Sequence, residues 1–410
     1  MKRELLCLVL LTKCFFVTNV SIAQTSTSSG TMAVFTDFPG GSAVVKNIDQ
    51  ERQIIRIVPE SNPGRGWEVW WYFRVEGLKV GSTITFEVTS NGFGLPDKAQ
   101  FSYDNKKWAH IDQAGERKGR TLMIYSQKVI QSTVWLAWGP PFVLSDAEAL
   151  VKKVTKKPYA RSLELARSIE GRSVPAVVVS QKGTASKNRP VIWVQARSHA
   201  WESGSSWVGR GFIEWLVSKD PLAESLRKNA LIYFVPVLDV DNVESGAGGK
   251  QQLPHDHYWD WSASPHFPEV RAAKSKISGF IADKSLKVFM DLHNPGAGNK
   301  EVLFFVPAKP LLISSRLQQQ DEFFKIAKEE MGGPSGFKGL LGPIGEGWDA
   351  LKEPACDCWV ADESNKAGLD ALAVTMETPW NISEGNQSGY LSRGAELGRS
   401  IARFVLADKP

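Results

Sequence analysis

Four apolar, β-rich runs constrain the fold of this chain more than any other feature of its sequence. They span residues 191–196, 231–238, 288–292 and 371–378, and each is long enough to form a strand buried on both faces. A stretch with helical spacing of apolar residues, from Trp207 to Leu216, follows the first run. This alternation predicts an α/β domain with a mixed, mostly parallel sheet flanked by helices.

Polar side chains stand where three of these runs end. His199 and Glu202 follow the first, His293 directly follows the third, and Glu377 lies near the end of the fourth. Ligands of open α/β sheets bind outside the carboxyl ends of the strands, so these four residues are expected to converge. His199, Glu202 and His293 form the ligand set of a catalytic zinc site with one open position. Glu377 is then the predicted general base, and the alternative is four unrelated surface residues.

The first 23 residues have the pattern of a cleavable signal peptide. Lys2 and Arg3 precede an apolar stretch over residues 5–20, and the small residues of Ser21-Ile22-Ala23 fit a cleavage site. The pattern predicts a secreted or periplasmic protein. An uncleaved membrane anchor is the alternative.

The cysteine content, the charge and the hydropathy of the rest of the chain argue against a cysteine metal site, a nucleic-acid partner and a membrane partner. Beyond residue 23 the chain keeps only Cys356 and Cys358, which are interpreted as two thiols or a strained local disulfide rather than a metal site. A formal charge of +5 is too small to indicate a nucleic-acid partner. No stretch after residue 23 could span a bilayer, so no stable membrane partner is predicted.

Residues 32–142 predict a separate all-β sandwich domain, with the catalytic domain over residues 143–410. Short alternating runs such as Thr83–Val88 are separated by turn signals. The aromatic residues of this part are expected in the sandwich core or its contact with the next domain, with a carbohydrate-binding surface as the alternative; they are Trp67, Trp70, Trp71 and Phe73. Ser145–Glu148 predicts a capping box that opens the first helix.

Two segments without strong periodicity, residues 239–270 and 332–370, are predicted loops that build or cover a site. The first contains His255, His257 and His266, which are expected to line a pocket or lie on the surface. A second metal site formed by His255-Asp256-His257 is the alternative. Asp291, two residues before His293, is expected either to orient a zinc ligand or to cap a backbone group.

Several motifs resemble the zinc carboxypeptidases (peptidase M14), particularly the branch of the cytosolic carboxypeptidases, in which a small β-sandwich precedes the catalytic domain. The run Ala196–Trp207 is similar to the first metal motif of that branch, Met290–His293 to the second, and Thr375–Glu377 to the strand with the catalytic glutamate. The resemblance also takes in Trp71–Val75. It implies zinc held by the two histidines and Glu202, and a peptide or amide-linked small molecule as substrate.

The sequence departs from this family where the substrate is held. The family carries an arginine for the oxyanion and an Asn-Arg pair for the terminal carboxylate, and the matching positions here are Lys250 and then Tyr258-Trp259. Lys250 supplies a point charge without a guanidinium fork. Tyr258 and Trp259 cannot clamp a carboxylate, so the substrate end is expected to be apolar, ring-shaped or blocked. Arg197 and Arg210 are possible replacements for the clamp.

Taken together, the sequence predicts a secreted zinc-dependent, metallocarboxypeptidase-like hydrolase that cleaves peptide or amide bonds. The alternative is an inactive or weakly active protein that binds peptides or glycans and keeps the fold.

Overall fold

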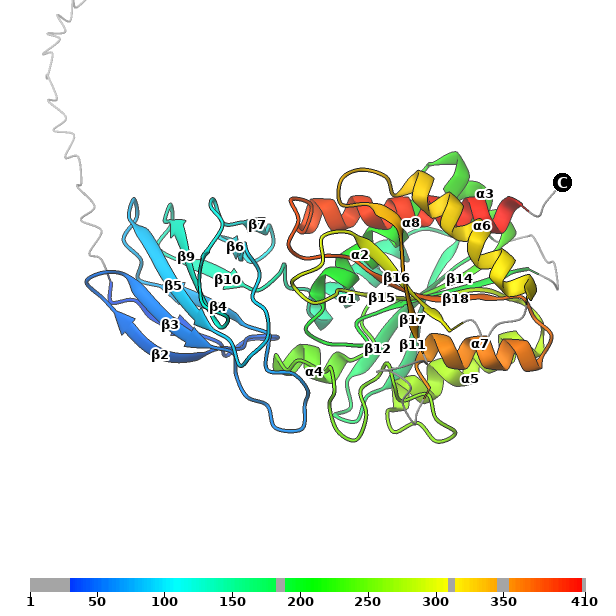
Figure 1. Cartoon of the computed structure of the whole chain (residues 1–410), viewed down its shortest axis with the longest axis horizontal. Coiled ribbons are helices and arrows are strands. Elements are labelled where there is room, and N and C mark those ends of the chain that lie inside the picture. Colours follow the sequence, from blue (N-terminus) through cyan, green and yellow to red (C-terminus); the bar gives the residue numbers. More distant parts are fainter. Residues whose placement is uncertain (1–29, 182–188, 309–313, 345–353, 408–410) are drawn as a thin grey trace, which may run out of the picture.

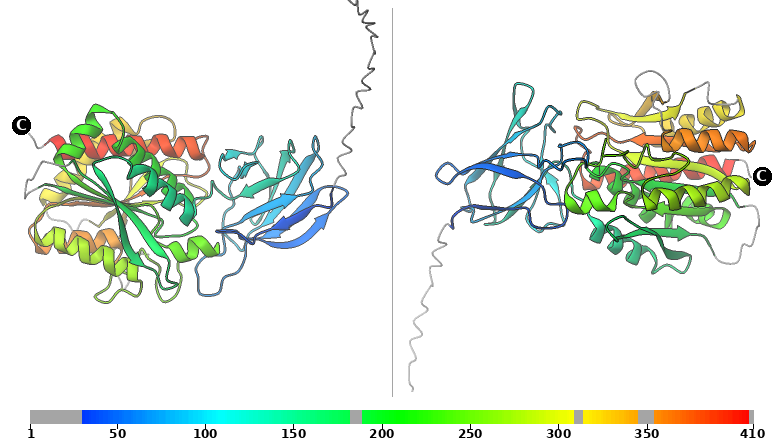
Figure 2. Two further views of the ribbon diagram at one scale, coloured as in Figure 1. Left: turned by 180° about the vertical axis from the view of Figure 1, so that it is seen from behind. Right: turned by 90° about the horizontal axis from the view of Figure 1, so that it is seen from below.

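The computed structural model describes residues 30–181, 189–308, 314–344 and 354–407. The predicted signal peptide lies outside these residues. In the described part of the chain, no helix combines the length and the apolar character needed to cross a membrane. Two domains lie end to end along the long axis of the molecule (Figures 1 and 2).

The N-terminal domain consists of two five-stranded sheets. One has the order β1 (Ala33–Phe35), β4 (Tyr72–Glu76), β10 (Val134–Ala137), β6 (Gln100–Ser102), β7 (Ala109–His110). The other has the order β2 (Val44–Asp49), β3 (Ile54–Val58), β5 (Thr83–Thr89), β9 (Leu122–Lys128), β8 (Glu116–Lys118). The predicted β-rich domain is therefore confirmed.

Aromatic side chains fill the core of this domain. Trp71 and Phe73 are fully buried, and the ring of Trp71 lies 5.9 Å from that of Phe86, which stacks on Tyr125 at 4.9 Å. Trp70 is also buried, and its indole N–H donates to the Gly40 carbonyl. Burial of such large side chains stabilises the domain, so these residues form a core rather than a binding surface. Trp67 is only partly buried and lies elsewhere, as described below.

The link between the domains leads into α1 (Leu144–Val154). The predicted capping box at Ser145 is wrong, because the N-cap is Val143, two residues earlier, and the helix begins at Leu144. The carboxylate of Asp146, at the third helical position, accepts the Val143 N–H at 3.0 Å. An acidic residue in the first turn also suits the helix dipole.

The second domain is built around an eight-stranded mixed sheet. Its order is β11 (Ala160–Arg167), β12 (Ser173–Val179), β14 (Leu231–Val235), β13 (Val191–Ala196), β15 (Leu286–His293), β18 (Leu372–Glu377), β16 (Val302–Pro307), β17 (Phe337–Ile344). The central pairings β14–β13, β13–β15 and β15–β18 are parallel, as is β16–β17, and the other three are antiparallel. The predicted fold class is confirmed.

Helices cover both faces of this sheet, which explains why its central strands read as uninterrupted apolar runs. In Figure 1, α2 (Ser203–Leu216), α3 (Pro221–Asn229), α6 (Ser314–Glu330) and α8 (Gln387–Ala407) lie above the sheet. Below it lie α5 (Pro268–Ala282) and α7 (Cys356–Lys366), with the short α4 (Val240–Ser245) near the N-terminal domain.

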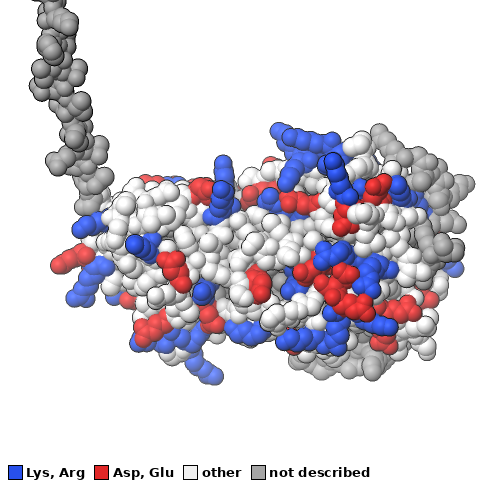
Figure 3. Space-filling model, turned by 90° about the horizontal axis from the view of Figure 1, so that it is seen from above, with Lys and Arg blue, Asp and Glu red and all other residues white. Residues whose placement is uncertain are grey.

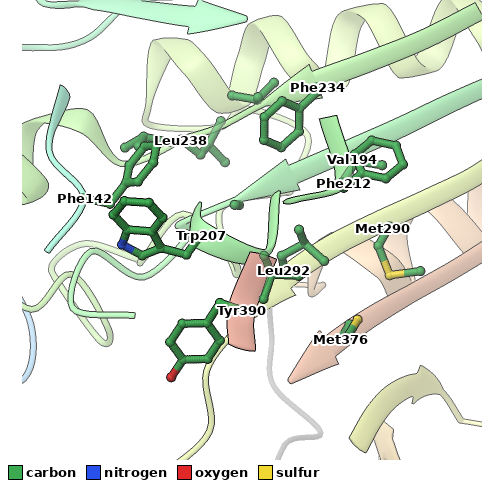
Figure 4. Close-up of a cluster of buried hydrophobic side chains, with 14 of the residues drawn as sticks. Phe142, Val194, Trp207, Phe212, Phe234, Leu238, Met290, Leu292, Met376 and Tyr390 are labelled. Atoms are coloured by element: carbon green, nitrogen blue, oxygen red, sulfur yellow. The ribbon is translucent and has the colours of Figure 1, made fainter. Parts of the chain in front are cut away.

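The main core of this domain lies between the sheet and α2. Phe212 of α2 meets Phe234 of β14, and Met290, Leu292 and Met376 face the same cluster (Figure 4). Gly211 lets α2 approach α8, because a Cβ at this position would lie 2.2 Å from the Leu391 carbonyl oxygen. These helices hold β13, β15 and β18, whose carboxyl ends carry the polar residues.

The outer surface over α8 and α6 carries acidic and basic side chains interspersed with one another (Figure 3). Arg399 and Arg403 of α8 pair with Glu330 of α6 at 2.8 and 2.9 Å. Exposed pairs of this kind contribute little free energy each, so we assign this face no role in the site.

The two segments predicted as loops contain regular elements. Residues 239–270 include α4 and the start of α5, and residues 332–370 include β17 and all of α7, while residues 345–353 lie outside the described part. Gly and Pro residues in Phe337–Ile344 obscured the strand, since both are depleted in strand interiors.

Candidate active site

The strand register brings the predicted site residues together. His293 of β15 is the direct partner of Glu377 of β18, and Ala196 of β13 is the partner of Leu292. His199 and Glu202 lie in the turn between β13 and α2, three and six residues beyond Ala196. The carboxyl ends of three neighbouring parallel strands therefore meet at one point, as in other open α/β sheets.

Glu202 lies between the two histidines. One of its carboxylate oxygens is 2.9 Å from Nδ1 of His199, and the other is 2.8 Å from Nδ1 of His293. The backbone N–H of Asn294 donates to the same carboxylate at 3.1 Å. Possible ligand atoms of the three residues all lie within 4.8 Å of one another, and all three side chains are buried.

This cluster fits a zinc ion. Two imidazole nitrogens and a carboxylate, turned toward one another in a buried position, are the ligand set that zinc prefers. Burial would raise the pKa of Glu202, but His199 and His293 outweigh it and hold the pKa well below its usual range. A negative charge is therefore kept among the nitrogen ligands, where a cation would be bound.

A second carboxylate faces the other nitrogen of each histidine. Oδ2 of Asp291 lies 3.1 Å from Nε2 of His293, and Oδ2 of Asp256 lies 3.4 Å from Nε2 of His199. Carboxylates in such positions fix the ring orientation of metal-binding histidines. The interpretation of Asp291 as an orienting residue is thus supported by its geometry. Asp256, which the sequence suggests only as part of an alternative second metal site, lies instead beside His199, and no strand end in the sequence indicates this.

Glu377 is buried beside the cluster. Burial, together with the nearby charge of Glu202, raises its pKa to about 7. The Thr378 N–H donates to the His293 carbonyl at 3.0 Å and so fixes the end of the strand. A carboxyl group that titrates near neutral pH suits proton transfer in both directions.

A cavity of about 310 Å³ opens onto these residues. Besides His199, His293 and Glu377, its lining includes the three predicted substrate-side residues Lys250, Tyr258 and Trp259. The remaining lining residues are Trp67, Gln251, Asp256, Phe305, Ile344 and Thr375. Of this second group, Trp67 comes from the N-terminal domain, and no short motif in the sequence marks it as part of a catalytic site.

Lys250 and Tyr258 are held in defined positions. Nζ of Lys250 lies 3.7 Å from Oε1 of Glu202 and 5.3 Å from the centre of the Trp67 ring. The hydroxyl of Tyr258 donates to Oδ1 of Asp357 at 3.2 Å, and its ring packs edge-on against that of Trp259. Burial, with the charge of Asp357, raises the pKa of Tyr258 well above its usual value, so the phenol stays neutral.

The alternative of a second metal site in the loop of His255 and His257 is wrong. Among the described residues, the only group suited to holding a metal ion is the His199, Glu202 and His293 cluster. His257 is instead buried in a hydrogen-bond network, with Nε2 2.6 Å from Glu269 Oε1.

Neither arginine considered for the clamp lines the cavity. Arg197 is buried and donates to the carbonyl of Phe142 at 3.0 Å and to that of Ala200; its burial lowers the guanidinium pKa to about 9. Arg210 pairs with Glu214 at 2.9 Å.

Cys356 and Cys358 are both buried thiols rather than a disulfide, in agreement with the first of the two interpretations from the sequence. The thiol of Cys356 donates to Oδ2 of Asp291 at 3.3 Å. It therefore packs behind the candidate metal site, on the side of Asp291.

Fold and site together define a zinc carboxypeptidase-like metallohydrolase. Residues 147–266 match the family model of zinc carboxypeptidases, and residues 34–138 match that of the cytosolic carboxypeptidase N-terminal domain. The chain therefore combines a zinc carboxypeptidase domain with an N-terminal domain of the cytosolic carboxypeptidase type.

Curated relatives and solved structures agree with this assignment. The chain is 25% identical to human cytosolic carboxypeptidase 1 over 281 residues, which cover 57% of this chain and 23% of the human protein. It is 22% identical to cytosolic carboxypeptidase 2 of Danio rerio over 57% of this chain and 37% of that protein. The chain thus spans well under half the length of these relatives.

The fold is that of bacterial metallo-carboxypeptidases. The crystal structure of the enzyme from Burkholderia cenocepacia superimposes with a TM-score of 0.77 at 20% identity, over 92% of this chain and 99% of that one. The enzyme from Pseudomonas aeruginosa, in complex with (2-guanidinoethylmercapto)succinic acid, gives a TM-score of 0.75 at 20% identity, with the same coverage.

The predicted secreted or periplasmic location is contradicted by these comparisons. The curated relatives are named cytosolic carboxypeptidases, and the N-terminal domain matches the model of the same group. A short basic and apolar N-terminal stretch is a weak signal, because it depends on composition alone.

Proposed function

We propose that this protein hydrolyses peptide or amide bonds, with His199, Glu202 and His293 as zinc ligands and Glu377 as general base. The observation that carries the proposal is the direct pairing of His293 with Glu377 across β15 and β18. It sets a base with a pKa of about 7 beside a buried ligand cluster at the floor of a cavity.

When bound, a zinc ion would supply Lewis-acid polarisation of the scissile carbonyl and acidify the attacking water. Glu377 takes one proton from that water as its oxygen adds to the carbonyl carbon. Glu377 then hands the proton to the leaving nitrogen as the C–N bond breaks. The products are a carboxylic acid and an amine.

Lys250 is the proposed electrostatic partner of the developing oxyanion. Among the described residues that line the cavity, Lys250 alone carries a positively charged lysine or arginine side chain. Its ammonium group lies 3.7 Å from Oε1 of Glu202. Preorganised positive charge beside developing negative charge lowers the transition-state free energy. A lysine does this without the bidentate geometry of arginine.

The cavity favours a substrate whose recognised end is apolar, ring-shaped or blocked. The cavity has an apolar lining, and no arginine is among the described residues that line it. The apolar lining residues are Trp67, Tyr258, Trp259, Phe305 and Ile344. The Tyr258 hydroxyl is already engaged by Asp357. A buried carboxylate left without a matched cation would be costly, so a bare C-terminal carboxylate is disfavoured.

The first test is zinc content per chain for the wild-type protein, for His293→Ala and for the control His266→Ala. His266 is exposed and lies outside the cavity. We expect one zinc per chain in the wild type and the control, and loss in His293→Ala. The zinc-loaded protein is then offered matched peptides with free and amidated C-termini.

Cleavage of amidated peptides at least as fast as the free acids supports the whole proposal. Cleavage of the free acids alone would keep the hydrolase and overturn the substrate argument. Zinc binding without cleavage of any amide would favour the alternative of a peptide- or glycan-binding protein.

A further inference from the structure

Trp67 belongs to the N-terminal domain but lines the cavity of the catalytic domain. It lies in the segment between β3, which ends at Val58, and β4, which begins at Tyr72. Its indole N–H donates to the Gln251 side-chain oxygen at 2.7 Å, and its ring stacks on Phe93 of the same domain at 4.6 Å. The ring is thus fixed from both domains, and one part of it faces the cavity.

The backbone around Trp67 is bonded to the segment that carries Lys250. The Trp67 N–H donates to the Lys250 carbonyl at 2.9 Å, and the Gly249 N–H donates to the Arg65 carbonyl at 2.9 Å. A third bond runs from the Leu253 N–H to the Gly64 carbonyl at 2.8 Å. These backbone hydrogen bonds join residues 64–67 of the N-terminal domain to residues 249–253 of the catalytic domain, at the edge of the active site. The two paired segments are called the ladder.

Glycines allow this close approach. A Cβ at Gly248 would lie 2.0 Å from the Trp67 carbonyl oxygen, and one at Gly66 would lie 2.6 Å from the Lys250 carbonyl oxygen. Gly66 also has a φ of +92°, which side chains rarely adopt. Beside the ladder, Arg65 forms an ion pair with Glu170 at 2.8 Å and donates to Asn242 at 2.6 Å.

We propose that Trp67 is a specificity-determining residue, by which the N-terminal domain supplies an aromatic wall of the substrate cavity. With Tyr258 and Trp259 it surrounds the group next to the scissile bond, and it selects substrates with a flat or ring-shaped group there. This inference rests on the proposed hydrolase function and deepens it.

Two features favour recognition over plain domain packing. The indole lies in the cavity lining, whereas Trp70 and Trp71 of the same segment are buried in their own domain. The Lys250 ammonium also lies 5.3 Å from the centre of the Trp67 ring, so the indole lies beside the proposed partner of the oxyanion. Tryptophan offers a large, rigid face for stacking, which suits a ring-shaped ligand.

The experiment compares Trp67→Ala and Trp67→Phe with the control Trp135→Ala. Trp135 is a partly buried tryptophan on β10 of the same domain and does not line the cavity. Each zinc-loaded full-length protein is assayed for kcat and KM on acetylated dipeptides whose last residue is Phe, Trp, Leu or Ala, both free and amidated. Melting temperature is recorded for each.

Binding is measured separately from turnover. Glu377→Gln and the double variant with Trp67→Ala are titrated calorimetrically with acetyl-phenylalanine amide and acetyl-alanine amide. This readout does not depend on catalysis. It also distinguishes the loss of the Trp67 ring from a displacement of Lys250, because a displaced Lys250 would lower kcat equally for all substrates.

We expect Trp67→Ala to lower kcat/KM and affinity for the aromatic probes about tenfold, with less than twofold change for the alanine probes. Trp67→Phe should recover most of the preference, and Trp135→Ala should leave it unchanged. An aromatic preference that Trp67→Ala leaves intact, or an equal loss on all probes, overturns the role of Trp67. Failure of the wild type to cleave any probe overturns the proposed function instead, while the calorimetric comparison still decides on Trp67.

Discussion

His293 and Glu377 are direct partners across the parallel pair β15 and β18, so that a candidate metal ligand and a candidate base are fixed by backbone hydrogen bonds rather than by a loop. Groups on strand ends are held more precisely than groups on loops, and catalysis depends on such precision.

Glu377→Gln is expected to lower kcat by about 10²–10⁴-fold while zinc content stays at the wild-type level. The amide keeps the size of the side chain but cannot take a proton. Turnover with a chromogenic amide, and metal analysis of the same samples, check this. Equal activity in the two proteins would refute the role of Glu377.

The raised pKa of Glu377 predicts a pH-dependent stability of the metal-free protein. Its pKa is about 7 in the folded chain and 4.5 in the reference state, because burial and the charge of Glu202 disfavour its ionisation. The folded state therefore binds more protons, and this residue's contribution to stability is present below pH 4.5 and lost as the pH rises to about 7.

Urea unfolding of metal-free wild type and Glu377→Gln between pH 4.5 and 8 tests this. The free energy of unfolding of the wild type should fall relative to the variant across this window, by at most about 1.4 kcal/mol per pH unit. A difference that stays constant with pH would show that Glu377 titrates normally.

The sequence predicted the residues whose positions follow from strands. His199, His293 and Glu377 stand at the ends of apolar runs, and parallel strands of one sheet bring their carboxyl ends together. Trp67 and Asp256 could not be found this way. Trp67 reaches its partner Gln251 across 184 positions of the chain, and Asp256 meets His199 only through the path of an irregular segment.

The strand β17 and the start of α1 show a different limit. Local sequence around Phe337–Ile344 is poor in strand-forming residues, and pairing with β16 overrides it. At α1, the apolar Val143 occupies the N-cap because Asp146 satisfies its backbone N–H. At β17 the pairing with a neighbouring strand decides the structure, and at α1 the hydrogen bond from the Val143 N–H to Asp146 does.

Asp291→Asn is expected to weaken zinc binding about 10–100-fold. The carboxylate lies 3.1 Å from Nε2 of His293, so its loss leaves the ring less firmly oriented and less basic. Competition with a chelator at constant pH measures the affinity. Asp283→Asn, at the end of α5 and away from the cavity, is the control and should bind zinc as the wild type does.

Gly211→Ala is expected to destabilise the protein by about 1–3 kcal/mol, because overpacking a tight helix contact forces the backbone to move. The added methyl group would lie 2.2 Å from the Leu391 carbonyl oxygen of α8, and backbone atoms cannot turn away as a flexible side chain can. The matched control is Gly279→Ala in α5, where an added Cβ meets nothing within 4 Å. There the better helix propensity of alanine should stabilise the protein by about 0.5–1 kcal/mol. Chemical unfolding of both variants gives the two free energies, and effects of the same sign would mean that α2 and α8 are not packed as closely as the glycines indicate.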